Sequence, residues 1–148
     1  MNLLQVLLIS ASPILELRGG IPLAIYLGFS PAEAYIISII GNFLPVPLLL
    51  IGLNRLIELF SGIEPIWSIY KRIEQRVERK KGIVEKYGYI GLLIFVAVPL
   101  PASGAWTGCL IATLLKMNRI KSTISILIGI CIAGLIVILP FVGLSFIN

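Results

Sequence analysis

The chain has 148 residues, of which 58% are hydrophobic and only 13% are charged, with a net charge of +5 and a mean hydropathy of +1.04. Soluble domains usually carry about 25% charged residues and keep much of their surface in water, so this composition excludes an ordinary soluble domain and predicts an integral membrane protein. The sequence has neither His nor Asp and lacks the motifs of phosphate-binding loops, nucleophile elbows and metal sites, so we expect no enzyme activity, cofactor or bound metal.

Four apolar stretches follow one another along the chain, at 3–29, 31–60, 89–115 and 122–147. Each is at least as long as the ~20 residues that a membrane-spanning helix requires. The first stretch lacks the basic residues that open a signal peptide, and an acidic-basic pair follows in place of a cleavage site. We therefore expect it to belong to the mature protein.

The first and third stretches are interrupted by helix-breaking or polar residues. The interruptions are Pro13, Glu16, Arg18, Gly19, Gly20 and Pro22 in the first stretch, and Pro99, Pro101, Ser103 and Gly104 in the third. Proline inside a helix removes a backbone hydrogen bond, so unwound backbone is expected at both places. Each interruption leaves arms of about 10 residues, which at ~1.5 Å per residue reach half the hydrocarbon thickness. We predict that both stretches form re-entrant helical hairpins, while 31–60 and 122–147 span the membrane.

Most basic residues gather in two segments. Seven of the twelve lie between Lys71 and Lys86, and three more lie between Lys116 and Lys121. If all four stretches spanned, the two segments would face opposite sides of the membrane. With two re-entrant hairpins both segments lie on the cytoplasmic face and both termini lie outside, which the positive-inside rule favours. Because the basic residues interrupt membrane segments, they indicate topology, and we expect no nucleic acid as a partner.

The same arrangement predicts one membrane domain, 1–148, that contains two inverted repeats. Each repeat is a hairpin followed by a spanning helix, at 3–60 and at 89–148. Inverted repeats with interrupted helices are a recurrent transporter design, with the binding site near the midplane of the bilayer. Between the repeats, 61–88 is expected to carry a basic amphipathic helix, whose apolar stripe consists of Ile66, Ile69, Ile73 and Val77. This helix would lie among lipid headgroups or pack on the cytoplasmic face of the protein.

Glu16 and Arg18 are the most informative polar residues. A charge at the centre of the bilayer costs at least ~2.5–3.5 kcal/mol on insertion scales, so the two residues need either compensation or a function. Since Pro13 and the Gly19-Gly20 pair flank them, we expect extended backbone, in which both side chains face one cavity. Glu16 is then a candidate proton carrier and Arg18 a candidate ligand for an anion. The alternative is a structural ion pair that pins the two hairpins together.

The third stretch offers neutral groups. Ser103 and Thr107 supply hydroxyls, Trp106 supplies an indole N–H, and the prolines and glycines free backbone groups. The amino terminus of a half-helix points partial positive charge at whatever occupies the cavity. Asn42 is a further polar residue in the second stretch, where a hydrogen bond between helices is the main alternative to a ligand role.

The two cysteines, Cys109 and Cys131, both lie in apolar stretches of a chain that has no His. Neither a disulfide nor a zinc site is expected from this pattern. We interpret both cysteines as small buried residues.

Two motifs, ELRGGIPLAI at 16–25 and PLPASGAWTG at 99–108, together resemble the small multidrug export family of bacteria and archaea. That family is similar to a minimal branch of the DedA superfamily, and the resemblance covers nearly the whole chain. It implies two re-entrant hairpins that face each other. Members of the wider superfamily are implicated in flipping polyprenyl phosphate carriers, in phospholipid scrambling and in proton-dependent transport.

The resemblance also implies which residues form the two hairpin motifs. They are Glu16, Arg18, Gly19 and Pro22 in the first hairpin, and Pro99, Pro101, Gly104, Ala105, Trp106 and Gly108 in the second. The larger DedA proteins carry acidic and arginine residues near the second hairpin as well. Here no charged residue lies between Tyr89 and Leu115, which argues against phosphate binding by a pair of arginines.

The sequence therefore predicts an all-α membrane protein whose hairpin tips meet near the middle of the bilayer. The first hypothesis is a transporter or flippase for an amphipathic anionic lipid, either a polyprenyl phosphate or a phospholipid, with proton coupling through Glu16. The second is a small-molecule or multidrug exporter. The third is a non-transporting structural or membrane-shaping protein. Membrane lipids are the expected partners, and the small size of the chain favours a homodimer.

Overall fold

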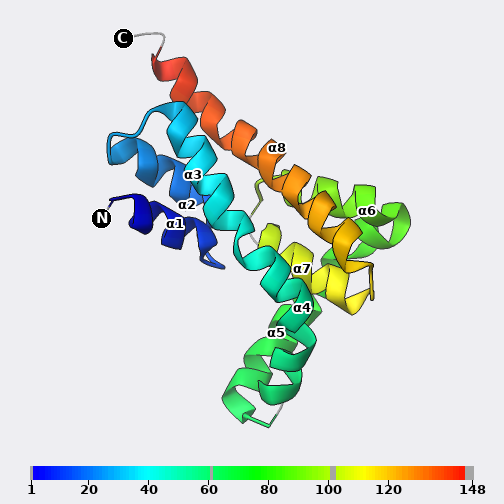
Figure 1. Ribbon diagram of the computed structural model, residues 1–148. Helices are drawn as coiled ribbons and strands as arrows, with labels where there is room; N and C mark the ends of the chain where they lie inside the picture. The colour runs from blue at the N-terminus through cyan, green and yellow to red at the C-terminus, as the bar shows by residue number, and fades with distance from the viewer. Residues whose placement is uncertain (1, 61, 101–102, 146–148) are drawn as a thin grey trace.

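The computed structural model describes residues 2–60, 62–100 and 103–145, and every element in these ranges is an α-helix (Figure 1). The helices are α1 (Asn2–Ala11), α2 (Glu16–Tyr26), α3 (Pro31–Phe43), α4 (Pro45–Phe60), α5 (Glu64–Lys80), α6 (Gly82–Ala97), α7 (Ala105–Leu114) and α8 (Arg119–Ser145). The predicted all-helical fold is confirmed. In Figure 1 α8 runs along the molecule, with α3 and α6 beside it.

Two helical runs are long and apolar enough to cross a membrane, Pro31–Arg55 and Arg119–Gly143. They correspond to the second and fourth apolar stretches, the two that we predicted to span. The first run joins α3 to α4 through Leu44, whose N–H donates to the Ile40 carbonyl oxygen at 3.0 Å. At ~1.5 Å per residue, either run exceeds the ~30 Å of the hydrocarbon core.

The other apolar stretches fold as two pairs of short helices. α1 packs on α2 and α6 packs on α7. The first pair turns at Pro13, and the second leaves α6 just before Pro99. α1 and α7 have 10 residues each and α2 has 11. These three lengths match the expected arms of about 10 residues, whereas α6 has 16 residues. We call α1–α2 the first hairpin and α6–α7 the second hairpin; that they are re-entrant stays a prediction.

The first interruption is shorter than predicted. The expected extended backbone at Glu16 and Arg18 is wrong, because α2 begins at Glu16 and continues through Gly19, Gly20 and Pro22. Close packing explains the glycines, since a Cβ on Gly20 would lie 1.8 Å from the hydroxyl oxygen of Ser10 on α1. The glycine pair therefore lets two helices approach each other and does not unwind the chain.

The basic region also differs from the single helix expected within 61–88. α5 ends at Lys80, α6 begins at Gly82, and α6 bends at Gly88, which has a φ of 57° and a ψ of −129° that only glycine adopts easily. A Cβ on Gly91 would lie 2.4 Å from the carbonyl oxygen of Ile83, so the two legs of α6 meet closely. The side chains of the predicted apolar stripe lie outside the described part of the structure.

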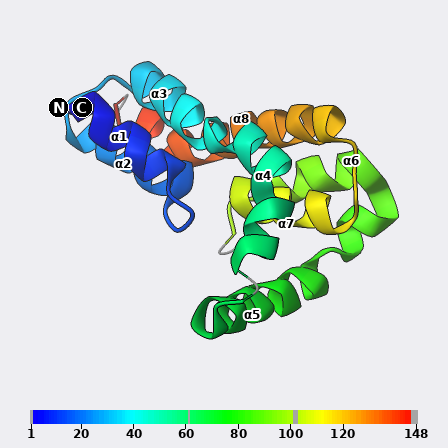
Figure 2. The ribbon, with the colours of Figure 1, turned by 60° about the horizontal axis from the view of Figure 1, so that its bottom comes forward.

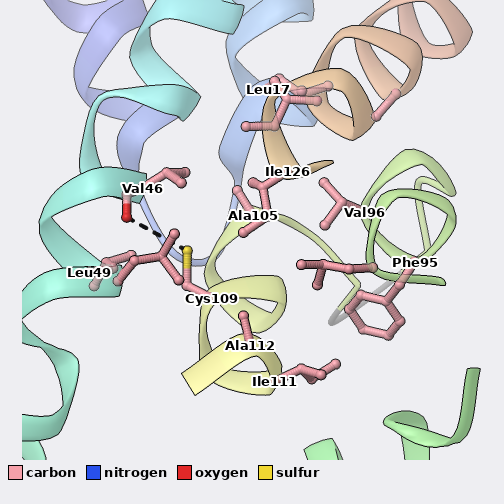
Figure 3. Close-up of a cluster of buried hydrophobic side chains, with 14 of the residues drawn as sticks. Leu17, Val46, Leu49, Phe95, Val96, Ala105, Cys109, Ile111, Ala112 and Ile126 are labelled. Atoms are coloured by element: carbon pink, nitrogen blue, oxygen red, sulfur yellow. Dashed lines mark hydrogen bonds between the residues drawn. The ribbon is translucent and has the colours of Figure 1, made fainter. Parts of the chain in front are cut away.

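The hydrophobic core surrounds α7 (Figure 3). Cys109 of α7 is fully buried, and its Sγ lies 3.9 Å from the Val46 carbonyl oxygen of α4. Leu17 of α2 and Ile126 of α8 belong to the same buried cluster. Both cysteines are free thiols; Cys109 is buried as expected, whereas Cys131 is partly exposed.

The basic segments lie away from the amino terminus. In Figures 1 and 2, α1 and the carboxyl end of α8 lie at one end of the molecule, whereas α5 and the turn from α7 into α8 lie away from that end. Both basic segments therefore lie away from the amino terminus. Which side of the membrane they face stays a prediction.

Candidate functional site

The candidate site is the junction between the first hairpin and the second, which we call the hairpin junction. Arg18 is half-buried on α2 and reaches the connection between α6 and α7. One of its terminal nitrogens donates to the Leu100 carbonyl oxygen and the other to the Ser103 carbonyl oxygen. These bonds use two of the five guanidinium N–H groups, so the others stay able to reach a further acceptor.

Glu16 lies against the amino terminus of α7. Its side chain is 7% exposed, and its Oε1 accepts a hydrogen bond from the Trp106 N–H at 3.3 Å. Gly104 stands at the N-cap position of α7 and has no side chain to cap the helix. A Cβ on Gly104 would lie 2.0 Å from Oε2 of Glu16, so the carboxylate occupies the place of a capping side chain.

The amino end of α7 is therefore an anion site that Glu16 already fills. The first N–H groups of a helix have no partner within it, and the helix dipole adds partial positive charge there. Glu16 is also the first residue of α2, with a φ of 51°, so its carboxylate lies near a second helix amino terminus. The sequence predicts that the amino end of α7 faces a bound substrate. In the structure the Glu16 carboxylate lies at this position.

Ser103 and Trp106 complete the junction. The Ser103 hydroxyl oxygen lies 2.8 Å from the carbonyl oxygens of Val98 and Leu100 and accepts from the Leu100 N–H at 3.1 Å, which shapes the connection. The Trp106 indole N–H donates to the Ala11 carbonyl oxygen at 3.0 Å, at the end of α1. Both helices of the first hairpin are thus bonded to the second hairpin.

Glu16 and Arg18 form no ion pair with each other in the described part of the chain. Their charges still interact at longer range, so the alternative of a structural ion pair stays a prediction. Each residue instead bonds to the main chain of the second hairpin. Each residue can therefore hold the two hairpins together through its own hydrogen bonds to the main chain.

The structure brings together only some of the predicted site residues. Those in contact at the hairpin junction are Glu16, Arg18, Ser103, Gly104 and Trp106. Pro99 lies in the same connection, whereas Pro101 lies outside the described residues. Gly19, Gly20 and Pro22 lie within α2, and Thr107 lies partly exposed on α7 without a side-chain bond in the described part.

Asn42 belongs to a separate buried region among α1, α2 and α3. Its Oδ1 and the hydroxyl oxygens of Ser10 and Ser38 are buried without a hydrogen-bond partner in the described part of the chain. Gly20 lies between the two serines, since a Cβ there would lie 1.8 Å from the Ser10 oxygen and 3.0 Å from the Ser38 oxygen. The Asn42 Oδ1 therefore makes no hydrogen bond to the hairpin junction in this part of the structure.

Sequence reasoning missed the main-chain partners of the site, which are the carbonyl groups of Ala11, Leu100 and Ser103 and the N–H of Trp106. A signal for one of them is present, because Leu100 stands between Pro99 and Pro101. Proline supplies no N–H, so carbonyl groups nearby are left free for other donors. The pairing with Arg18 depends on how the hairpins pack, and no local pattern contains it.

The family model described as "Putative small multi-drug export protein" matches residues 16–136. The chain belongs to this family. The match begins at Glu16 and includes α2, the connection 98–104 and α7, so every charged and main-chain group of the junction except Ala11 lies within it. Comparisons with curated proteins and with solved structures find no match.

Membership confirms the small multidrug export resemblance, while the relation to the DedA superfamily stays a prediction. The family and the two long apolar helices together indicate a membrane protein with an export role.

Proposed function

We propose that this member of the small multidrug export family moves an amphipathic anionic lipid across the bilayer by way of the hairpin junction. The observation that supports this proposal is the carboxylate of Glu16 at the amino end of α7, next to Arg18. A group that binds one carboxylate through helix N–H groups can bind the anionic headgroup of a lipid in the same way.

Exchange at this anion site gives a route for proton coupling. An ionised Glu16 competes with a headgroup for the N–H of Trp106, whereas a protonated Glu16 carries no charge and is held less strongly by the helix dipole. The headgroup then takes the place of the carboxylate and accepts from the N–H groups of Arg18 that face no carbonyl. Return of the charge to Glu16 displaces the headgroup again.

The proposed topology gives this exchange a place in the bilayer. Re-entrant hairpins with arms of 10 or 11 residues would set their tips near the midplane, at about half the hydrocarbon thickness. Two inverted repeats in one domain, cytoplasmic basic segments, external termini and a homodimer belong to the same proposal. The position of both basic segments away from the amino terminus supports the topology.

A small-molecule or multidrug exporter is the second candidate. The description of the family favours it, and so does the second hairpin, which has no charged residue between Tyr89 and Leu115 and presents Trp106 near the junction. In that case Glu16 and Arg18 would be needed for resistance to toxic compounds and not for lipid movement. A structural protein is the third candidate, and it requires that replacing both residues with apolar ones leaves function intact.

The test measures lipid movement in proteoliposomes with acyl-chain-labelled phosphatidylglycerol and dithionite quenching. We expect wild type to expose inner-leaflet label quickly, and Glu16→Gln and Arg18→Ala to abolish this movement. Glu85→Gln and Arg55→Ala are matched controls, because both residues are exposed and lie away from the junction. If well-folded wild type moves no more lipid than empty vesicles, lipid transport is refuted and the small-molecule exporter becomes the leading candidate.

A further inference from the structure

A groove lies in the bend of α6, which we call the α6 groove. Its volume is about 650 Å³, within the ~300–1,000 Å³ range of typical small-molecule sites. The bend at Gly88 folds the first leg of α6, 82–87, back toward the second leg, 89–97. Residues of both legs line the groove, together with Arg79 of α5 and with Val98, Leu100 and Ser103 beyond α6.

The two walls of the α6 groove differ in chemistry. Arg79 of α5 and Lys86 of the first leg supply two cations on one wall, which also holds Ile83 and Tyr87. Ile94 and Phe95 of the second leg, followed by Val98, supply an apolar surface on the other wall. Cations facing an apolar surface suit a molecule that has an anionic headgroup and a hydrocarbon chain.

The nearest carboxylates pair with a third cation, Lys81, and not with Arg79 or Lys86. Lys81 lies 3.3 Å from Glu78 and 3.3 Å from Glu85, so it holds both neighbouring acids. Arg79 and Lys86 are exposed and have no ion-pair partner in the described part of the chain. The Lys86 Nζ lies 5.2 Å from the centroid of the Tyr87 ring, a contact that does not neutralise its charge. Both cations can therefore attract the phosphate of a lipid at the membrane surface.

The α6 groove also touches the hairpin junction. Leu100 and Ser103 line the groove, and their carbonyl oxygens accept the two hydrogen bonds from Arg18. A chain in the groove thus ends beside the residues that hold the two hairpins together.

We infer that the α6 groove binds one anionic membrane lipid, with its phosphate at Arg79 and Lys86 and an acyl chain along Ile94, Phe95 and Val98. Its role as the entry site for transport rests on the proposed function. The binding itself does not, because the groove, its charges and its apolar wall are independent of any movement across the membrane.

The test uses the purified full-length chain in mild detergent with equimolar phosphatidylglycerol and phosphatidylcholine, and native mass spectrometry counts the lipid retained. We expect wild type to retain phosphatidylglycerol in preference. The double change Arg79→Gln, Lys86→Gln should lower its retention about 25-fold, because each cation near a membrane surface contributes about a factor of five. Val98→Trp should lower retention as well, since it fills the groove and changes no charge.

The matched control is Arg119→Gln, Lys121→Gln, which removes the same two charges from exposed positions of α8 outside the groove. It should retain phosphatidylglycerol within about twofold of wild type. Equal losses in the groove double variant and the control would overturn the inference, as would displacement of the lipid by inorganic phosphate alone. Loss with Arg79→Gln, Lys86→Gln but not with Val98→Trp would also overturn it, because headgroup attraction alone would then suffice.

The same variants in the proteoliposome assay separate the two proposals. Groove-dependent retention by a wild type that moves no labelled lipid would refute the proposed function and support the α6 groove as a lipid site. Lipid movement by wild type without groove-dependent retention would support the function and refute the groove.

Discussion

The first hairpin carries Glu16 and Arg18, whereas the second has no charged residue between Tyr89 and Leu115. What the second hairpin contributes is main chain: two carbonyl groups that accept from Arg18 and an N–H group that donates to Glu16. The side-chain charges of one hairpin thus meet the backbone dipoles of the other. The difference shows that the two hairpins have complementary parts of one site.

Neither hairpin could keep this arrangement alone in a membrane. Arg18 and Glu16 without the second hairpin would be unpaired charges in an apolar medium, and the connection 98–104 would have unpaired backbone groups. Each such group costs several kcal/mol where water is absent. We therefore predict that substitutions at the contacts between the hairpins lower the free energy of unfolding of the whole protein. Similar substitutions elsewhere should not.

Arg18→Ala should have the largest effect on stability. It removes two charge-assisted hydrogen bonds and takes this donor from the Ser103 carbonyl group, whereas the Leu100 carbonyl group keeps the Ser103 N–H at 3.1 Å. We expect a loss of about 3 kcal/mol in the free energy of unfolding. Unfolding in detergent by sodium dodecyl sulfate, followed by circular dichroism, measures this loss. Arg55→Ala, on the exposed side of α4, should change the free energy by no more than about 0.5 kcal/mol. Equal losses in both variants would contradict the complementary arrangement.

Gly104→Ala should follow, at about 2 kcal/mol, because the new methyl group would overlap the Glu16 carboxylate and force one of the two to move. Gly52→Ala on α4 is the control, since a Cβ there meets nothing within 4 Å, and it should be neutral or mildly stabilising. Both are measured in the same unfolding titration.

A double-mutant cycle sharpens this prediction. In a Glu16→Ala background the carboxylate is absent, so Gly104→Ala should cost much less than in wild type. If the two losses simply add, the cost of Gly104→Ala does not come from overlap between the new methyl group and the Glu16 carboxylate.

The features that sequence predicted are those that local patterns contain. Proline at positions 13, 99 and 101, together with the lengths of the apolar stretches, indicated where the short helices end and which helices are long. The rarity of charge in apolar segments pointed to Glu16 and Arg18, which the structure brings to the junction.

The features that sequence did not predict depend on contacts between distant segments. Gly19 and Gly20 suggested unwound backbone, yet they lie inside α2 because a neighbouring helix packs against them. The bend at Gly88 brings the legs of α6 together at Gly91, which is a tertiary contact. Backbone acceptors are invisible in sequence for a related reason, since every residue has a carbonyl group and only the fold selects which one Arg18 meets.

Trp106→Phe should have the smallest effect, about 1 kcal/mol, because it removes one neutral hydrogen bond and keeps most of the aromatic surface. The Ala11 carbonyl that loses its donor is at the end of α1, where a helix leaves carbonyl groups unpaired. Thr107→Ala, one residue further along α7, should change the free energy of unfolding by less than about 0.5 kcal/mol. A loss at Trp106 as large as that at Arg18 would mean that the indole fixes the hairpins and that charge is secondary. A loss near about 1 kcal/mol would mean that the bonds of Glu16 and Arg18 to the main chain are the main link between the two hairpins.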